Sequence, residues 1–245
     1  KPTWKKKFAS LYKEAINTGD PAVIGIIASG VGDSTLGYRP VIGDFSFLHD
    51  ARSKLSLPRD NEALQPLESA IAYFEGNPGP VIKNQFNNPI DWELVKTIPT
   101  DARAVIKTNH GHIIIKLLVE EAPGSVANFI RLAREGYFDN KFFHRVVPNF
   151  VIQAGCHRGD GWGSEDYSIR SEFSDRKYKT GSVRMASAGK DTEGTQWFIT
   201  HSPTPHLDGR YTIFAEVESG VDAVHMMEVG DRILDVEIRT GRQIN

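Results

Sequence analysis

Residues 142–155 read FFHRVVPNFVIQAG and place one arginine between two short apolar runs that a turn at Pro148 joins. Each run has the length and the side chains of a β-strand, and proline followed by asparagine is typical of a turn. Strict alternation along the first strand predicts that Phe143, Arg145 and Val147 share one face. Taken alone, Arg145 is a strand arginine whose stem covers apolar surface while its guanidinium reaches water or a carboxylate.

A second stretch combines polar and aromatic side chains in the same way. In GTQWFIT, residues 194–200, alternation predicts that Gln196 and Phe198 face one side while their apolar neighbours face the other. In the opening stretch, Val151 and Gln153 likewise share a face after the turn. The sequence therefore predicts two strands that each present a polar and an apolar side chain together.

Short strands and one helix surround these motifs. From about Ala102 the apolar residues follow the strand period, and a hairpin is predicted around residues 109–111. The stretch SVANFIRLAREGYF, residues 125–138, has helical periodicity and Gly136 at its end. The residues predicted to face inward from this helix are Val126, Phe129, Ile130 and Ala133. One helix among many short strands predicts a closed barrel or a sandwich with helical caps.

The first 78 residues follow the helical period instead. Gly19 suits a helix end, Asp20 an N-cap and Pro21 the first position of the next helix. Two more helices are predicted, at residues 44–55 and 60–76, the second with an N-cap at Asp60 and a proline in its first turn. Capped starts about forty residues apart are similar to HEAT-type helical repeats. Ordinary helices with a solvated face are the plainer alternative.

Residues 79–100 are rich in proline and asparagine, which predicts a connector that Trp92 and Leu94 dock on a neighbour. The first residue is lysine, which indicates a processed or shortened product from which any targeting segment would be missing, so the compartment is left open.

Composition argues against several classes of function. The net charge of -2 gives no broad positive field, so nucleic acid is not expected as a partner. A single cysteine, Cys156, excludes an internal disulfide framework and a Cys-rich zinc site. His110 and His112 have no further ligand cluster beside them, so no metal site is predicted. No apolar run approaches the roughly 18 residues of a membrane span.

Three separated motifs give the second half of the chain a family resemblance. FFHRVVPNFVIQAG, MASAGKDTEGTQWFIT and HLDGRYTIFAEV, in this order and spacing, strongly resemble the cyclophilin family of peptidyl-prolyl isomerases. The resemblance implies a mainly β fold over residues 101–240, an eight-stranded antiparallel barrel capped by two helices. The helical segment 1–78 and the connector 79–100 would precede it. The second cap is expected in GVDAVHMME, residues 220–228.

The resemblance also implies an active groove on the outer wall of the barrel. Arg145 matches the family's catalytic arginine, and Gln153 is expected to orient its guanidinium. The residues expected to bind substrate are Phe150, Val151, Ala186, Ser187, Ala188, Gln196, Phe198, His206, Leu207 and Tyr211. His206 stands where tryptophan is frequent, which weighs against tight binding of cyclosporin-like drugs more than against turnover.

The implied activity is cis-trans isomerisation of X-Pro bonds in peptides or unfolded proteins, which aids folding and needs no cofactor. A permanently charged donor such as Arg145 suits this chemistry, because the proline nitrogen becomes an acceptor as the amide twists. The alternative is a proline-peptide-binding module or adaptor with little turnover. In that case the helical segment would be the docking surface for a protein partner.

Overall fold

The computed structural model of the protein describes residues 3–80 and 82–240 and divides the chain into two units. The first unit ends at Lys83, and the second begins at Asn84. Residues 1–2 of the predicted helical segment and residue 81 of the predicted connector lie outside the described residues. The boundaries predicted after residues 78 and 100 stay predictions.

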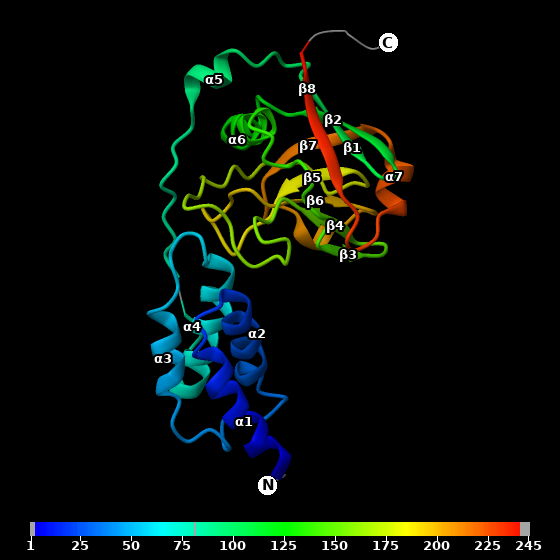
Figure 1. Cartoon of the computed structure of the whole chain (residues 1–245). Helices are drawn as coiled ribbons and strands as arrows, with labels where there is room; N and C mark the ends of the chain where they lie inside the picture. Colours follow the sequence, from blue (N-terminus) through cyan, green and yellow to red (C-terminus); the bar gives the residue numbers. More distant parts are fainter. Residues whose placement is uncertain (1–2, 81, 241–245) are drawn as a thin grey trace. The chain divides into compact units, whose positions relative to one another are not determined.

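The first unit is helical, as the sequence predicted. Its described helices are α1 (Thr3–Ile16), α2 (Pro21–Gly32), α3 (Ser46–Arg52) and α4 (Asn61–Glu75) (Figure 1). The start of α2 is confirmed, because the Asp20 side chain accepts the N–H groups of Ala22 and Val23. The end of α4 is confirmed as well, since Gly76 takes the left-handed conformation with a φ of 80°.

Two details of α4 differ from the prediction. Asp60 does not cap the helix with its side chain, because its Oδ2 accepts the N–H of Ser56 at 2.7 Å in the preceding turn. Pro66 lies inside the helix instead of in its first turn. A proline there has no N–H for the helical ladder, so this turn of α4 has one hydrogen bond fewer.

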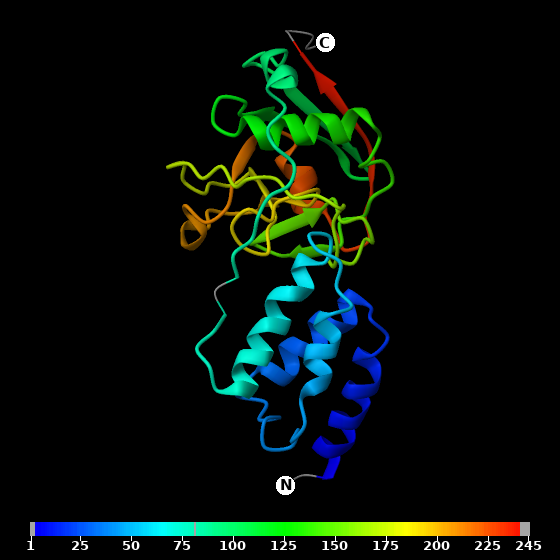
Figure 2. The ribbon, with the colours of Figure 1, turned by 90° about the vertical axis from the view of Figure 1, so that its left-hand side faces the viewer.

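Helices α2 and α4 lie side by side (Figure 2). Small residues permit this approach, because a methyl group on Gly32 would come within 3.0 Å of the Ala70 Cα. Ile24, Ala28 and Leu67 have no exposed surface in this interface and its surroundings. Burial within the first unit therefore explains the apolar residues on one face of α2, whereas Ile26 of the same helix remains 60% exposed.

The second unit is built on a sheet that contains eight strands among the described residues. They are β1 (Arg103–Thr108), β2 (Gly111–Leu117), β3 (Arg145–Val147), β4 (Val151–Ala154), β5 (Ser182–Met185), β6 (Trp197–Thr200), β7 (Ile213–Ser219) and β8 (Ile233–Arg239). Every paired neighbour is antiparallel, in the order β3-β4-β6-β5-β7-β2-β1-β8. The sheet curls (Figure 1), and an isolated bridge between Phe142 and Arg232 links the chain beside its two edge strands. The predicted eight-stranded antiparallel fold is confirmed.

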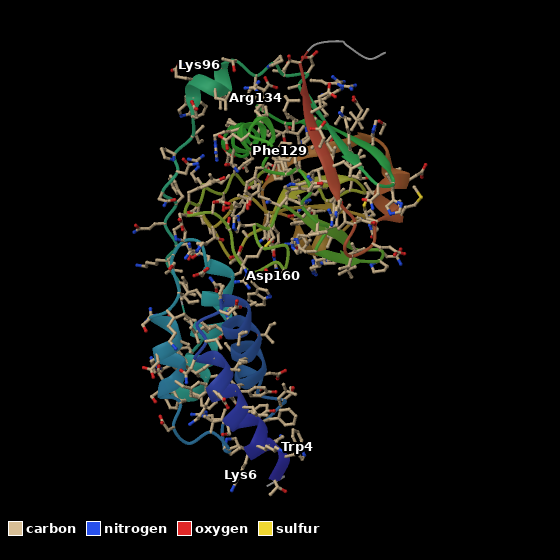
Figure 3. The ribbon with its side chains drawn as sticks, viewed as in Figure 1. Trp4, Lys6, Lys96, Phe129, Arg134 and Asp160 are labelled. Atoms are coloured by element: carbon tan, nitrogen blue, oxygen red, sulfur yellow. The ribbon has the colours of Figure 1, made fainter. Side chains whose placement is uncertain are left out.

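Two helices cap this sheet, as predicted. They are α6 (Pro123–Arg134) and α7 (Val221–Met226). The four residues predicted to face inward from α6 are all buried. Phe129, labelled in Figure 3, packs on Phe138, Trp197 and Phe214 with ring centroids 5.1, 6.1 and 5.2 Å apart. This aromatic cluster fills the inside of the curled sheet, so the groove must lie elsewhere.

The chain that leads into the sheet packs on the second unit. The backbone N–H groups of Asn87 and Asn88 donate to Ser168 O at 3.2 and 3.0 Å. A short helix, α5 (Trp92–Lys96), follows. Leu94 packs against the barrel core as predicted, whereas Trp92 remains 54% exposed. Among the described residues, no helix has both the length and the apolar character needed to cross a membrane.

Candidate active site

A groove of about 180 Å³ opens on the outer face of the curled sheet. Its lining residues come from β3, β4, the chain after β5, β6 and the segment around the short helix η1 (Pro205–Leu207). They are Arg145, Phe150, Val151, Gln153, Ala186, Ser187, Phe198, Leu207 and Tyr211. The structure therefore brings nine of the twelve predicted site residues to one cavity.

Strand pairing explains how three of these residues meet. Arg145 on β3 lies directly opposite Gln153 on β4, and Gln153 lies opposite Phe198 on β6. Directly paired residues in neighbouring strands project to the same face of a sheet. Because the inner face is filled by the aromatic core, this row faces outward and forms one continuous strip of the groove.

The prediction that Phe143 shares a face of the sheet with Arg145 is wrong. Phe143 has no exposed surface and belongs to the core, whereas Arg145 is exposed, so the two do not share a face. The reason is that β3 begins only at Arg145, while the N–H of Phe143 donates to Asp231 O at 2.8 Å. Regular alternation starts after this irregular connection, and Val146 is then the residue that packs on the core.

Arg145 lies beside the aromatic rim of the groove. Its guanidinium carbon is 5.7 Å from the centroid of the Phe150 ring, and Phe150 stacks on His206 at 5.8 Å. The Phe150 carbonyl accepts the N–H of His201 at 2.9 Å, which fixes the backbone at this point. His206 is thus a neighbour of the groove although it does not line the cavity.

The floor of the groove is apolar. Phe198 is buried, and the Tyr211 ring meets it nearly at a right angle with centroids 5.7 Å apart. Leu207 and Val151 complete the lining near this floor. The arrangement gives a small apolar pocket next to one exposed cation, which suits a ring with a polar bond at its edge.

A chain of amide groups lies behind the row. Gln153 Nε2 donates to Gln196 Oε1 at 3.0 Å, and Gln196 Nε2 lies 3.3 Å from the carbonyl oxygens of both Gly161 and Gly163. Gln196 is buried and does not line the cavity, but it fixes the side chain that does. Ala188 is also outside the lining, and its N–H donates to Thr192 Oγ1 at 2.9 Å.

His144 is a residue of this region that the sequence interpretation did not single out. Burial lowers the pKa of its imidazole to about 4, although the charge of Asp160 opposes the effect. The ring is therefore neutral at neutral pH, next to Gly161 behind the groove. Because His144 directly precedes Arg145 in the sequence, its position next to the groove could have been predicted.

No metal site accompanies the groove: within residues 3–80 and 82–240, no group of three or more His, Cys, Asp and Glu side chains is placed to hold an ion. The functional groups that do line the groove are the guanidinium of Arg145, the amide of Gln153 and the apolar and aromatic side chains of the pocket.

Known proteins match the second unit. A family model described as cyclophilin type peptidyl-prolyl cis-trans isomerase/CLD matches residues 103–243. A peptidyl-prolyl cis-trans isomerase of Synechococcus elongatus is 41% identical over 140 residues, which cover 56% of this chain and 97% of that protein. Peptidyl-prolyl cis-trans isomerase B of Bacillus subtilis is 45% identical over 128 residues, 51% of this chain and 90% of that protein.

Solved structures agree with these sequence matches. A cyclophilin type peptidyl-prolyl cis-trans isomerase of Cryptosporidium parvum has a TM-score of 0.53 and 29% identity, covering 57% of this chain and 98% of its own. A second structure of that protein, in the presence of the dipeptide Ala-Pro, has the same TM-score and 28% identity.

Proposed function

The chain belongs to the family of cyclophilin-type peptidyl-prolyl cis-trans isomerases, and we propose that it catalyses X-Pro isomerisation in the groove of Arg145, Phe150 and Phe198. The observation that carries this assignment is the strand row that sets the exposed Arg145 opposite Gln153 and Gln153 opposite the pocket floor. The cation and the apolar pocket lie within one cavity.

Rotation about an X-Pro bond requires loss of amide resonance, and its barrier is about 18–20 kcal/mol. As the bond twists, the proline nitrogen regains a lone pair and becomes a hydrogen-bond acceptor. A guanidinium beside that nitrogen binds the twisted state better than the planar one, which lowers the barrier. Arg145 suits this role because it stays protonated and offers several donors.

The apolar pocket supplies the second part of the catalysis. Phe198, Leu207 and Val151 hold the pyrrolidine ring still while the chain on the other side of the bond swings. Gln153 keeps its place beside Arg145 through its bond to Gln196. Ala186 and Ser187 also line the groove, and the peptide chain passes along them. Proline-containing peptides and unfolded chains are therefore the substrates that fit this groove.

The test is the cis-to-trans rate of a short X-Pro peptide with wild type, Arg145→Ala and Arg134→Ala. Arg134 is an exposed arginine of α6 and serves as the matched control. A charge-assisted hydrogen bond contributes about 1.5–3 kcal/mol, so Arg145→Ala should lower kcat/KM by roughly tenfold to 150-fold. A folded Arg145→Ala variant with unchanged kcat/KM would refute the assignment, and retained peptide binding without turnover in wild type would favour a binding module.

We further propose that the helical unit binds a protein partner through one face of α1. Trp4, Phe8 and Leu11 recur at helical spacing and are 55%, 44% and 49% exposed. Clustered exposed apolar side chains of this kind favour a protein contact. A photo-crosslinking residue in place of Phe8 should capture the partner, whereas one in place of Ser10 should not. Equal capture at both positions would contradict the proposal.

A further inference from the structure

A carboxyl group is buried directly behind the groove wall. Glu193 lies on the loop between the wall residues Ala186 to Ala188 and the buried Gln196, and none of its surface is exposed. Its backbone oxygen accepts the N–H of Ile169 at 2.8 Å, which ties this loop to the segment beside it. A charged residue type in such a position has to be neutral, paired or strained.

The side chain of Glu193 joins three segments. Ser171 Oγ lies 2.6 Å from Oε2 and Thr212 Oγ1 lies 3.1 Å from Oε1, and in the neutral form of the carboxyl group its own proton is donated to one of these two hydroxyls. Ser171 Oγ also accepts the N–H of Asp191 at 2.8 Å. Thr212 directly follows Tyr211, which lines the groove. One carboxyl group therefore connects the chain behind both walls of the groove.

The charges around this carboxyl group are acidic. Asp191 lies on the same loop, and Glu172 shares the Thr212 hydroxyl through its backbone N–H at 2.7 Å. Glu172 itself accepts the N–H groups of Gly124 and Ser125 at the start of α6. Arg170, the basic neighbour of Ser171 in the chain, is exposed. No cation pairs with Glu193 among the described residues, and burial raises its pKa to about 7.

We propose that Glu193 is a positioning residue of the isomerase, whose neutral carboxyl group holds the groove walls in the form that binds proline peptides. When the group ionises, its charge faces Asp191 in a site that has no exposed surface and no cation partner among the described residues. The loop then moves toward solvent to hydrate the charge, which displaces Ala186, Ser187 and Tyr211. The inference rests on the proposed function of the groove and adds a pH dependence to it.

The experiment measures peptide affinity and kcat/KM between about pH 6 and about pH 9 on the full chain. Wild type should lose about fivefold or more in affinity for an Ala-Pro peptide across this range. Glu193→Gln keeps a neutral, isosteric side chain and should lose almost nothing. Glu120→Gln, an exposed glutamate of the same unit, is the matched control and should behave like wild type.

Two further variants separate this effect from general damage and from other titrating groups. Ser171→Ala removes a donor that favours the ionised carboxylate, so the pKa of Glu193 rises and the loss of affinity should move to higher pH. His206, on the rim of the groove, is tested by His206→Gln, which should keep the wild-type loss above neutral pH. A purely structural role of Glu193 would not shift a midpoint in this way.

The carboxyl carbon of Glu193, followed by NMR in labelled protein, reports its ionisation directly. A midpoint near its ordinary value of 4.5, or equal pH profiles for wild type and Glu193→Gln, would overturn the proposal. If wild type binds no peptide even at about pH 6, the groove assignment itself fails instead, so the two failures are distinguishable.

Discussion

The free energy of unfolding should reveal two buried groups that titrate in opposite directions. Burial raises the pKa of Glu193 from 4.5 to about 7 and lowers the pKa of His144 from 6.5 to about 4. Glu193 binds more protons in the native state than in the unfolded chain. Its contribution to stability is therefore complete below about pH 4.5 and is lost as the pH rises through about 7.

His144 acts with the opposite sign. Its neutral native form binds fewer protons than the unfolded chain, so its contribution is absent below about pH 4 and grows until about pH 6.5. Each shift corresponds to about 3 kcal/mol, because one pKa unit is worth about 1.4 kcal/mol. The two contributions nearly cancel in wild type. Burial lowers the pKa of His201 as well, which adds a smaller change with the sign of His144.

Glu193→Gln removes one of the two contributions and so exposes the other. We expect the free energy of unfolding of the variant, relative to that of wild type, to increase by about 3 kcal/mol between about pH 4 and about pH 8. Urea unfolding followed by near-UV circular dichroism measures this difference at each pH. The test is whether the difference in unfolding free energy between variant and wild type changes with pH, because a difference that is the same at every pH reports only altered packing. A difference that stays constant with pH would refute the raised pKa and the reasoning built on it.

Three other substitutions test the fold. Arg184→Met should raise the free energy of unfolding by about 2 kcal/mol, because the guanidinium is buried without a hydrogen-bond partner among the described residues; urea titration measures it. Gly155→Ala should lower the melting temperature by several degrees, because its φ is 86° and a methyl group would collide with Thr195 O. Asp20→Ala should cost about 1 kcal/mol of helical-unit stability through loss of the α2 cap, measurable by hydrogen exchange in α2.

The sequence predicted helix ends and helix starts correctly where they depend on a few neighbouring residues. Gly19, Asp20 and Pro21 mark a helix end and a helix start within three residues, and the structure has both. The prediction that the Asp60 side chain caps α4 was wrong. An aspartate before a helix can accept N–H groups either from the helix or from the preceding turn, and Asp60 accepts the N–H of Ser56 in that turn. The prediction for the face of Phe143 was also wrong, because side chains alternate regularly only inside a strand, and β3 begins at Arg145.

The same distinction between local and long-range information applies to the site. The three motifs identified the residues of the groove, since nine of the twelve line one cavity. Sequence did not show that Gln196 acts from behind through Gln153, or that Ala188 points its N–H to Thr192. Glu193 was also hidden, because its burial depends on Ser171 and Thr212, which lie 22 and 19 residues away. Such contacts are products of the folded topology and leave no periodic pattern.

The groove combines supports of two kinds, and they match the two tasks of an isomerase. Arg145, Gln153 and Phe198 belong to paired strands, whose ladder bonds fix them against the aromatic core. Stabilising the twisted amide needs such a fixed donor, because a guanidinium that had to reorganise would forfeit part of its advantage. Leu207 ends the short helix η1, and Tyr211 and the wall at 186–188 come from loops and turns, so these parts lie outside the sheet. On the proposed mechanism, the strand row supports the chemistry, and the segments outside the sheet determine which peptide reaches it and under which conditions.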